Sequence, residues 1–131
     1  MKEAIRRHIL IIDPDRDIGE LFARALESRR ESRCYLCATE ADALELLKDI
    51  RIDLVLVDLG MAMAGDFSLL KKIRRAAPDT IIVVDAYLHQ KPYLRQARDL
   101  GANGCIMKPV KIEQFRKQID EFYVGALHSS L

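Results

Sequence analysis

The chain has 131 residues, a length that suits one folded domain with a single hydrophobic core. Lys and Arg total 21 and Asp and Glu total 20, so the net charge of +1 provides no general attraction for nucleic acid or an acidic membrane. No apolar run approaches the length of a membrane span and the N-terminal residues lack the apolar core of a signal peptide, so we expect a cytoplasmic protein.

The three cysteines argue against a closed disulfide framework, because an odd number cannot pair completely within one chain. Cys34 and Cys37 form a C-x-x-C pair, but they lie in a segment that we expect to be a strand. Positions three apart on a strand face opposite sides of the sheet, so the pair is predicted not to share a disulfide or a metal.

Four unbroken apolar runs each end in a charged residue. An apolar run without alternation is typical of a strand that is buried on both faces in the middle of a parallel sheet. The runs and the charged residues after them are 9–12 with Asp13, 54–57 with Asp58, 81–84 with Asp85, and 105–107 with Lys108. A carboxylate is costly to hold in apolar surroundings, so these residues are expected at strand ends, near water or a partner.

In chain order, the first strand is predicted at 8–12 and is followed by a helix that starts at Pro14, whose fixed φ suits a first helical turn. The apolar stripe of this amphipathic helix consists of Ile18, Leu21, Phe22, Ala25 and Leu26. A second strand is predicted at 33–38, and a capping box at 39–42 opens the second helix.

After Asp58, the small residues at 59–65 predict a flexible loop over the end of the third strand. Asp66 is predicted to cap the third helix, which carries Phe67 and further apolar residues on its inner face. Pro78 lies just past the end of this helix, as is common after a C-cap.

The C-terminal half continues the alternation, with a strand at 80–84 and a helix that begins near Pro92 and closes at Gly101. A short strand at 104–107 and a helix at 112–122 complete the chain. Five strands alternating with five helices predict an α/β fold, a (βα)5 flavodoxin-like three-layer sandwich with a parallel five-stranded sheet of order 2-1-3-4-5.

The carboxyl ends of the strands are the expected ligand site of such a sheet, and Asp13 and Asp58 would flank one crevice there. Two carboxylates and the backbone carbonyl of Gly60 form a hard-oxygen site suited to Mg²⁺. These residues predict a Mg²⁺-assisted phosphoryl acceptor in which Asp58 is the nucleophile and Lys108 neutralises the transferred group. The alternative is that the charges only keep the sheet edge hydrated, but their recurrence on four core strands favours function.

These residues together resemble the receiver domain of response regulators in two-component signalling. The resemblance rests on Ile-Ile-Asp at 11–13, Leu-Val-Leu-Val-Asp at 54–58, Gly-Ala at 101–102 and Lys-Pro at 108–109, and it covers about residues 9–124. It implies that Asp58 is the phosphoacceptor, that Asp13 is one of an acidic pair organising Mg²⁺, and that Lys108 contacts the phosphate. It also implies a domain that is not an enzyme, a cis bond before Pro109, and a sensor histidine kinase or phosphotransfer protein as partner.

The sequence departs from the family at several positions. Pro14 replaces the second acid after the first strand, so Mg²⁺ binding is predicted to be weakened, unless Asp15 reaches the site. Asp85 occupies the position of the switching Ser or Thr, and Cys105 that of the switch aromatic. The proline four residues after the phosphoacceptor is Ala62, and the usual Asp-Gly is inverted at 65–66.

Asp85 is the departure with the largest physical effect. A hydroxyl can donate to a phosphoryl oxygen, whereas an ionised carboxylate repels it. At about 4 Å and an effective dielectric near 20, each unit-charge pair costs on the order of 4 kcal/mol. We therefore expect an atypical receiver whose output is partly independent of phosphorylation.

Two other functions are considered. The first is a receiver-fold interaction module that binds an effector or a second copy through its fourth and fifth helices without phosphorylation. The second is a haloacid-dehalogenase-like phosphatase with Asp13 as nucleophile, suggested by the D-x-D at 13–15, but it leaves the buried strand ending in Asp58 unexplained. We expect one domain over 1–131 with no output domain after the last helix, and neither membrane nor direct nucleic-acid binding.

Overall fold

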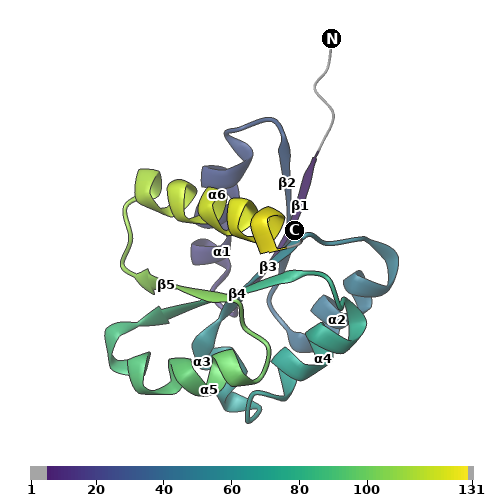
Figure 1. Ribbon diagram of the computed structural model, residues 1–131, viewed down its shortest axis with the longest axis vertical. Coiled ribbons are helices and arrows are strands. Elements are labelled where there is room, and N and C mark those ends of the chain that lie inside the picture. The colour runs from purple at the N-terminus through teal and green to yellow at the C-terminus, as the bar shows by residue number, and fades with distance from the viewer. Residues whose placement is uncertain (1–5, 130–131) are drawn as a thin grey trace.

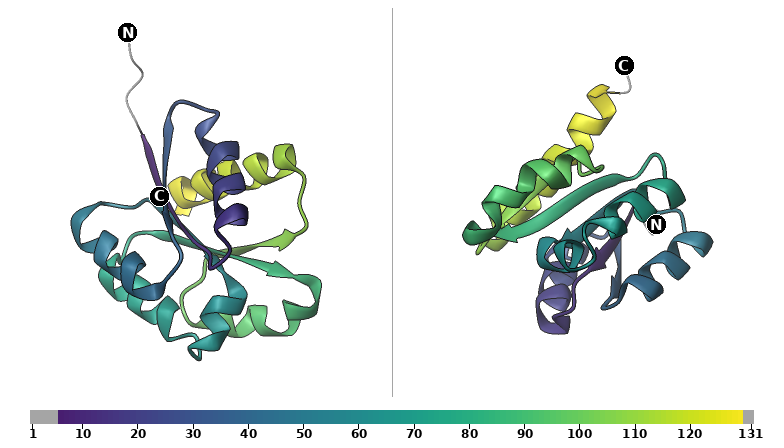
Figure 2. Two further views of the ribbon diagram at one scale, coloured as in Figure 1. Left: turned by 180° about the vertical axis from the view of Figure 1, so that it is seen from behind. Right: turned by 90° about the horizontal axis from the view of Figure 1, so that it is seen from below.

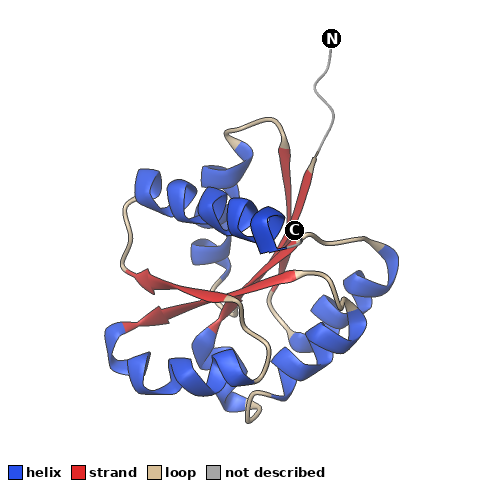
Figure 3. Cartoon of the chain, viewed as in Figure 1, coloured by secondary structure: helices blue, strands red, loops and turns tan. Residues whose placement is uncertain are grey.

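In the computed structural model, the chain forms a five-stranded parallel sheet of order β2-β1-β3-β4-β5, covered by helices on both faces (Figures 1 and 3). The structure describes residues 6–129, and the side chains of residues 6–125. The strands are β1 (Arg7–Ile12), β2 (Ser32–Cys37), β3 (Leu54–Asp58), β4 (Ile81–Tyr87) and β5 (Gly104–Lys108). The helices are α1 (Arg16–Glu27), α2 (Glu40–Asp49), α3 (Leu59–Ala64), α4 (Ser68–Ala76), the 3₁₀ helix η1 (Leu88–Tyr93), α5 (Leu94–Asp99) and α6 (Ile112–Ser129). The predicted fold class and strand order are confirmed.

The two faces of the sheet carry separate hydrophobic cores. Helices α1 and α6 cover one face and α2 to α5 cover the other, as Figure 1 and the rear view in Figure 2 show. Along β1, Ile9 and Ile11 join the α1–α6 core, where the rings of Phe22 and Phe115 stack 4.5 Å apart. Leu10 and Ile12 join the opposite core. The unbroken apolar runs are therefore explained by burial on both faces, as predicted.

Cys34 and Cys37 lie on β2 and contribute to opposite cores, Cys34 beside α1 and α6 and Cys37 beside α2. Both are free thiols, which confirms that this C-x-x-C pair forms no disulfide. Leu21 departs from its predicted place on the buried stripe of α1, because its side chain is 53% exposed. Ala23 takes a buried position on this helix instead.

The segment 59–65 is not the loop that its small residues predicted. Residues 59–64 form helix α3, which buries Leu59 and Ala62 and is capped by Asp58, whose Oδ2 accepts the Met61 amide at 2.9 Å. Asp66 does not cap the next helix, since it and Phe67 adopt left-handed backbone angles and α4 begins at Ser68 without a side-chain cap. Asp58 therefore starts a helix directly after β3, and the left-handed backbone at Asp66 and Phe67 leaves α4 without a side-chain cap.

Other boundaries also differ from the sequence prediction: α1 begins at Arg16 rather than Pro14, and α6 continues to Ser129 rather than ending at residue 122. Strand β4 continues to Tyr87, beyond the predicted end at residue 84, and Pro92 lies inside η1 rather than at the start of an α-helix. The Lys108–Pro109 peptide bond is cis, as the family resemblance implied. None of the helices in the described part of the chain is both long and apolar enough to cross a membrane.

Helix α4 is tied to the sheet by Arg74. One terminal nitrogen of its guanidinium donates to the carbonyls of Pro78 and Thr80, at 3.0 and 2.5 Å. The other donates to the carbonyl of Gly101 and to Oδ1 of Asn103, both at 2.8 Å. All four acceptors are neutral oxygens, and the Asp79 carboxylate acts on the guanidinium from beyond ion-pair distance.

Candidate functional site

Three carboxylates meet at the carboxyl edge of the sheet, as the strand-end pattern predicted. Asp13 follows β1, Asp58 ends β3, and Asp85 lies near the end of β4, where it is the register partner of Asp58. Each residue offers one carboxylate oxygen, and these oxygens all lie within 4.8 Å of one another. Their proximity follows from the strand order, because β1, β3 and β4 are consecutive in the sheet.

Lys108, at the end of β5, contacts two of these acids. Its Nζ donates a hydrogen bond to Oδ1 of Asp58 at 3.0 Å and lies 2.7 Å from Oδ1 of Asp85. The ring of Tyr87 covers the ammonium from a third side, with its centroid 4.4 Å from Nζ. Burial lowers the pKa of Lys108, but Asp85 and Asp58 outweigh it, so the pKa is raised and the ammonium stays charged.

Asp85 is the most enclosed of the three acids, at 1% exposure. The contact with Lys108 has ion-pair distance, yet no group among the described residues meets hydrogen-bond geometry at either carboxylate oxygen of Asp85. Burial raises the pKa of Asp85 to about 6, against the opposing effect of the Lys108 ammonium, and the charges of Asp58 and Asp13 add to the rise. The Lys108 contact is short but poorly aligned, and it offsets only part of the cost of burying the Asp85 carboxylate.

Asp13 is also buried and only half satisfied. Its Oδ1 accepts the backbone amide of Asp15 at 2.8 Å, while Oδ2 has no partner among the described residues. Burial raises the pKa of Asp13 and outweighs the Asp15 hydrogen bond, which lowers it. The side chain of Asp15 itself caps α1 by accepting the amides of Asp17 and Ile18, so it is committed to that helix.

Asp58 is the acid that solvent reaches, with 15% of its side chain exposed. Both of its oxygens are engaged: Oδ1 accepts from Lys108 and Oδ2 from the Met61 amide at the start of α3. A Cβ at Gly60 would lie 3.2 Å from Asp58 Oδ2 and from Gln90 Nε2 of η1, so this position favours a residue without a side chain. Gly60 lies in the first turn of α3, where carbonyls point along the helix axis.

The charge balance of the site favours a cation. Three carboxylates face one ammonium, and three of the buried carboxylate oxygens, one on Asp13 and two on Asp85, lack a hydrogen-bond partner among the described residues. Carboxylate oxygens in this number suit a hard divalent ion such as Mg²⁺, which would offset the excess negative charge. These carboxylate oxygens therefore fit the predicted metal.

Comparison with known families matches residues 9–120 to the response regulator receiver domain. The chain belongs to this family. Among curated relatives, it is 30% identical over 102 residues to a protein-glutamate methylesterase/protein-glutamine glutaminase of Myxococcus xanthus, covering 77% of this chain and 29% of the relative. It is 27% identical over 89 residues to the response regulator GacA of Pseudomonas aeruginosa, covering 68% and 42%. The receiver-like chain therefore spans less than half the length of these two relatives.

Solved structures show the same fold at lower identity. The chemotaxis response regulator CheY4 of Vibrio cholerae has a TM-score of 0.79 at 19% identity, with 88% of this chain and 98% of that chain covered. NtrX of Brucella abortus has a TM-score of 0.83 at 22% identity, with 94% and 28% covered. The receiver identity places the chain in two-component signalling as a response regulator domain.

Tyr87 and Gln90 are site residues that the sequence pattern did not reveal. Gln90 accepts the Tyr87 amide at 2.9 Å through Oε1 and so fixes η1 beside the end of β4. Tyr87 stands two positions after Asp85, and alternation along a strand puts positions i and i+2 on one face. This alternation was the available signal, but the predicted strand ended at residue 84.

Proposed function

We propose that this receiver domain accepts a phosphoryl group on Asp58 from the phosphohistidine of a sensor kinase or phosphotransfer protein. The observation that carries the proposal is the pairing of a solvent-reachable Asp58 with the Lys108 ammonium at 3.0 Å. A carboxylate oxygen of Asp58 would form the P–O bond as the donor's P–N bond breaks, with its electron pair left on the imidazole. Lys108 would stabilise the charge that collects on the phosphoryl oxygens.

Mg²⁺ is the proposed cofactor, held by Asp13 and Asp58, and it would neutralise charge on the incoming phosphoryl group. An Asp85 oxygen lies within 4.8 Å of the Asp13 and Asp58 oxygens, so Asp85 would partly replace the acid that is missing at Pro14. The role of the Gly60 carbonyl as a Mg²⁺ ligand stays a prediction. Its place in the first turn of α3 counts against that role in this conformation, because helical carbonyls point along the helix axis.

Asp85 is proposed to restrain the transfer. It lies 2.7 Å from the same ammonium that the phosphoryl group needs, and it brings a second negative charge beside the acceptor. An arriving phosphoryl group must therefore displace Asp85 from Lys108, and it then lies beside the negative charge of Asp85. This combination supports slow phosphorylation and weak switching compared with a receiver that has a hydroxyl at this position.

Exposed apolar side chains near η1 provide a surface for partners. Leu88 is 72% exposed and Tyr93 44% exposed, and both lie in the segment that joins β4 to α5. An effector or a second copy of the chain is proposed to bind there. The Tyr87 ring covers the Lys108 ammonium, and η1 begins at the next residue. A change in the partners of Lys108 would therefore be felt at the exposed residues of η1.

The phosphatase alternative finds no support at Asp13. Its side chain is buried, and one oxygen is committed to the Asp15 amide, whereas a nucleophile must reach its substrate. Generic phosphatase turnover that is lost in Asp13→Asn and retained in Asp58→Asn would revive this alternative.

The deciding experiment treats the full chain with acetyl phosphate and Mg²⁺ and follows intact mass. The parent should gain one phosphoryl group, and Asp58→Asn should gain none. Asp85→Thr should be labelled faster than the parent, because a charge is removed and a donor is restored. Equal labelling rates in the parent and Asp85→Thr would show that Asp85 is not a brake. No labelling of either would favour the interaction module that works without phosphorylation.

A further inference from the structure

Helix α3 begins at the carboxylate that serves as phosphoacceptor in the proposed function. Asp58 is the N-cap of this helix, and its Oδ2 accepts the Met61 amide at 2.9 Å. Its Oδ1 accepts a hydrogen bond from Lys108 at 3.0 Å. Both oxygens are therefore engaged, and a ligand that binds Asp58 has to compete with one of these two contacts.

A divalent cation at Asp58 would compete with the helix rather than with Lys108. The ion and the ammonium repel each other, so Oδ2 is the favoured oxygen because it is the one that Lys108 does not contact. At Oδ2 a cation meets the Met61 N–H and the positive end of the α3 dipole, and both oppose it. Metal binding at Asp58 and a closed first turn of α3 therefore disfavour each other.

Helix α3 has little stability of its own. It contains six residues, and isolated helices of this length do not persist in water. Its second residue is Gly60, which favours the helical conformation less than any residue except proline. The helix is therefore held by the Asp58 cap, by burial of Leu59 and Ala62, and by its C-terminus.

The C-terminus of α3 depends on a residue with an unfavourable backbone conformation. The Phe67 amide donates to the Ala62 carbonyl at 2.8 Å, and the Asp66 amide donates to the Met63 carbonyl at 3.0 Å. This hydrogen-bond pattern is a Schellman motif, in which the residue after the C-cap is left-handed and is usually glycine. Here that residue is Asp66, with a φ of 53°, so closing α3 carries a backbone cost that glycine would avoid.

We propose that α3 is a conformational switch whose first turn is closed by Asp58 in the absence of metal and opens when Mg²⁺ binds Asp58. Opening would turn the Gly60 carbonyl away from the helix axis and make it available to the ion. This inference rests on the proposed function, because it concerns the same metal. It adds that the stability of α3 sets the Mg²⁺ affinity, since only the open form binds the ion well.

The first turn of α3 also touches the surface proposed for partners. A Cβ at Gly60 would lie 3.2 Å from Nε2 of Gln90, so this turn packs against η1. Oε1 of Gln90 accepts the Tyr87 amide at 2.9 Å. Opening the turn would remove the Gly60 contact and so change the surroundings of η1.

The first test needs no metal. Asp58→Asn and Asp58→Ala both remove the charge beside Lys108, but only the asparagine variant keeps an oxygen that can accept the Met61 amide. Amide hydrogen exchange at residues 62–67 of the full-length chain should be about fivefold faster in Asp58→Ala than in Asp58→Asn, the usual effect of losing an N-cap. Equal exchange in the two variants would overturn the proposal, because Asp58 would then not hold α3 closed.

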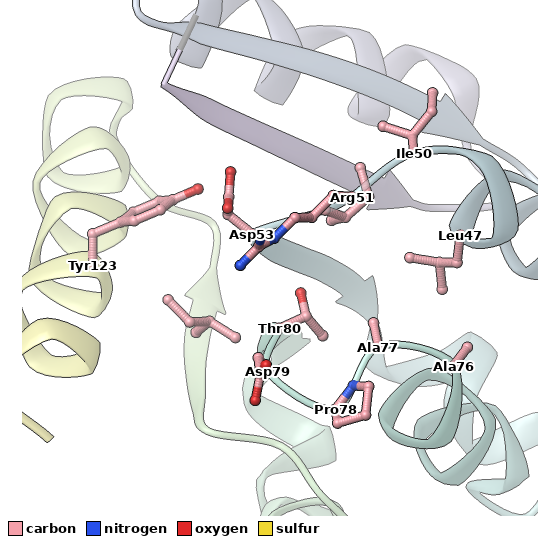
Figure 4. A pocket seen from close by; sticks show the side chains of 12 residues that line it. Leu47, Ile50, Arg51, Asp53, Ala76, Ala77, Pro78, Asp79, Thr80 and Tyr123 are labelled. Carbon is pink, nitrogen blue, oxygen red and sulfur yellow. The ribbon is translucent and has the colours of Figure 1, made fainter. Parts of the chain in front are cut away.

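The second test titrates Mg²⁺ into the parent and follows backbone amides by NMR. The amides of Asp13 and Lys108 report binding of the ion, and those of residues 59–67 report α3. Residues 59–67 should shift with the same apparent affinity as the binding signals and should lose protection from exchange. The internal reference is the group at 50–53 and 76–81, which lines a cavity of about 450 Å³ at the opposite edge of the sheet (Figure 4) and should not respond.

A matched pair of variants at Asp66 tests the coupling. Asp66→Gly and Asp66→Ala remove the same exposed charge, but only glycine suits the left-handed backbone at this position. The glycine variant should therefore favour the closed helix and bind Mg²⁺ about threefold more weakly than the alanine variant. Equal affinities, or tighter binding by the glycine variant, would overturn the proposal.

The outcomes separate this switch from the proposed function. If Asp13 and Lys108 respond to Mg²⁺ while residues 59–67 keep their signals and their protection, the metal site stands and the switch is overturned. If no amide at the carboxyl edge responds, the proposed cofactor and the switch are both wrong. Labelling of Asp58 by acetyl phosphate is read separately by intact mass.

Discussion

Two cations in this domain are held in opposite ways. Arg74 donates to four neutral oxygens within hydrogen-bond distance, and each of its terminal nitrogens has two acceptors. Lys108 faces carboxylates, and the nearer one, Asp85, has no hydrogen-bond partner of good geometry among the described residues. The first arrangement is complete as it stands. The second leaves negative charge and acceptor capacity unused.

The difference separates a structural site from a functional one. A charge that is fully hydrogen-bonded by neutral groups has no reason to exchange partners, so Arg74 serves to tie α4 to β4 and the start of β5. A cation among excess carboxylates is ready to accept another ligand, whether a metal beside it or a phosphoryl group on Asp58. Four experiments test this contrast.

The largest effect is expected for Lys108→Met. Removing the cation leaves three carboxylates together, two of them buried, and should lower the free energy of unfolding at pH 7 by about 3–5 kcal/mol. Urea unfolding measures the loss, and Lys117→Met on the exposed face of α6 is the matched control, with a change below about 0.5 kcal/mol. A loss as small as that of the control would mean that the ion pairs contribute no net stability.

The pH dependence of stability should reveal Asp85. Its folded-state pKa of about 6 is above the ordinary 3.8, so the folded state binds more protons and stability falls as pH rises from about 4 to 6. The total is about 3 kcal/mol for a shift of this size. Asp85→Asn should lack this slope, and comparison with the parent from pH 4 to 7 isolates it from other groups. Parallel curves for the two proteins would contradict the raised pKa.

Arg74→Met should cost less and show no such slope. Losing four hydrogen bonds to neutral oxygens should lower the free energy of unfolding by about 2 kcal/mol, since some of the freed acceptors can be hydrated. The loss should vary little from pH 4 to 7, because none of the four acceptors titrates and the Asp79 carboxylate acts on the guanidinium only from beyond ion-pair distance. Arg75→Met, at an exposed position of the same helix, is the control. A loss that varied strongly with pH would show that Asp79 contributes more to holding Arg74 than the neutral acceptors do.

The smallest effect is expected for metal binding in Pro14→Asp. An added carboxylate beside Asp13 should strengthen Mg²⁺ binding by about tenfold, or about 1.4 kcal/mol, as measured by calorimetric titration. The parent should bind weakly. Pro14→Asn supplies a similar shape without the charge and should gain less. If the acid brings no gain, Asp85 already completes the cation site.

Most of the fold was accessible from the sequence because its signals are local. Each predicted strand matches an observed one, with the largest boundary error at the end of β4. An apolar run that ends in a charge identifies a central strand and its carboxyl end without knowledge of its neighbours. The strand order then brought Asp13, Asp58 and Asp85 to one edge.

The errors fall where local signals compete. The segment after β3 contains two possible caps, Asp58 and Asp66, and small residues compatible with a loop or a helix. The helix forms because Asp58 caps it and because Leu59 and Ala62 find a buried surface. Leu21 is exposed for a related reason, since helical periodicity identifies a stripe but not which of its edges meets the sheet.

The sequence by itself determined the parallel sheet, the acids and the lysine at its carboxyl edge, and the departures at Pro14 and Asp85. Tertiary structure alone decided how that charge is shared: Lys108 lies between Asp58 and Asp85, with Tyr87 against it. It also decided the cavity at the other edge, which is assembled from separate segments. The physical reason is the distance along the chain over which each feature is set. Patterns among neighbouring residues set secondary structure, whereas burial, ion pairing and cavities depend on side chains that are far apart in the sequence.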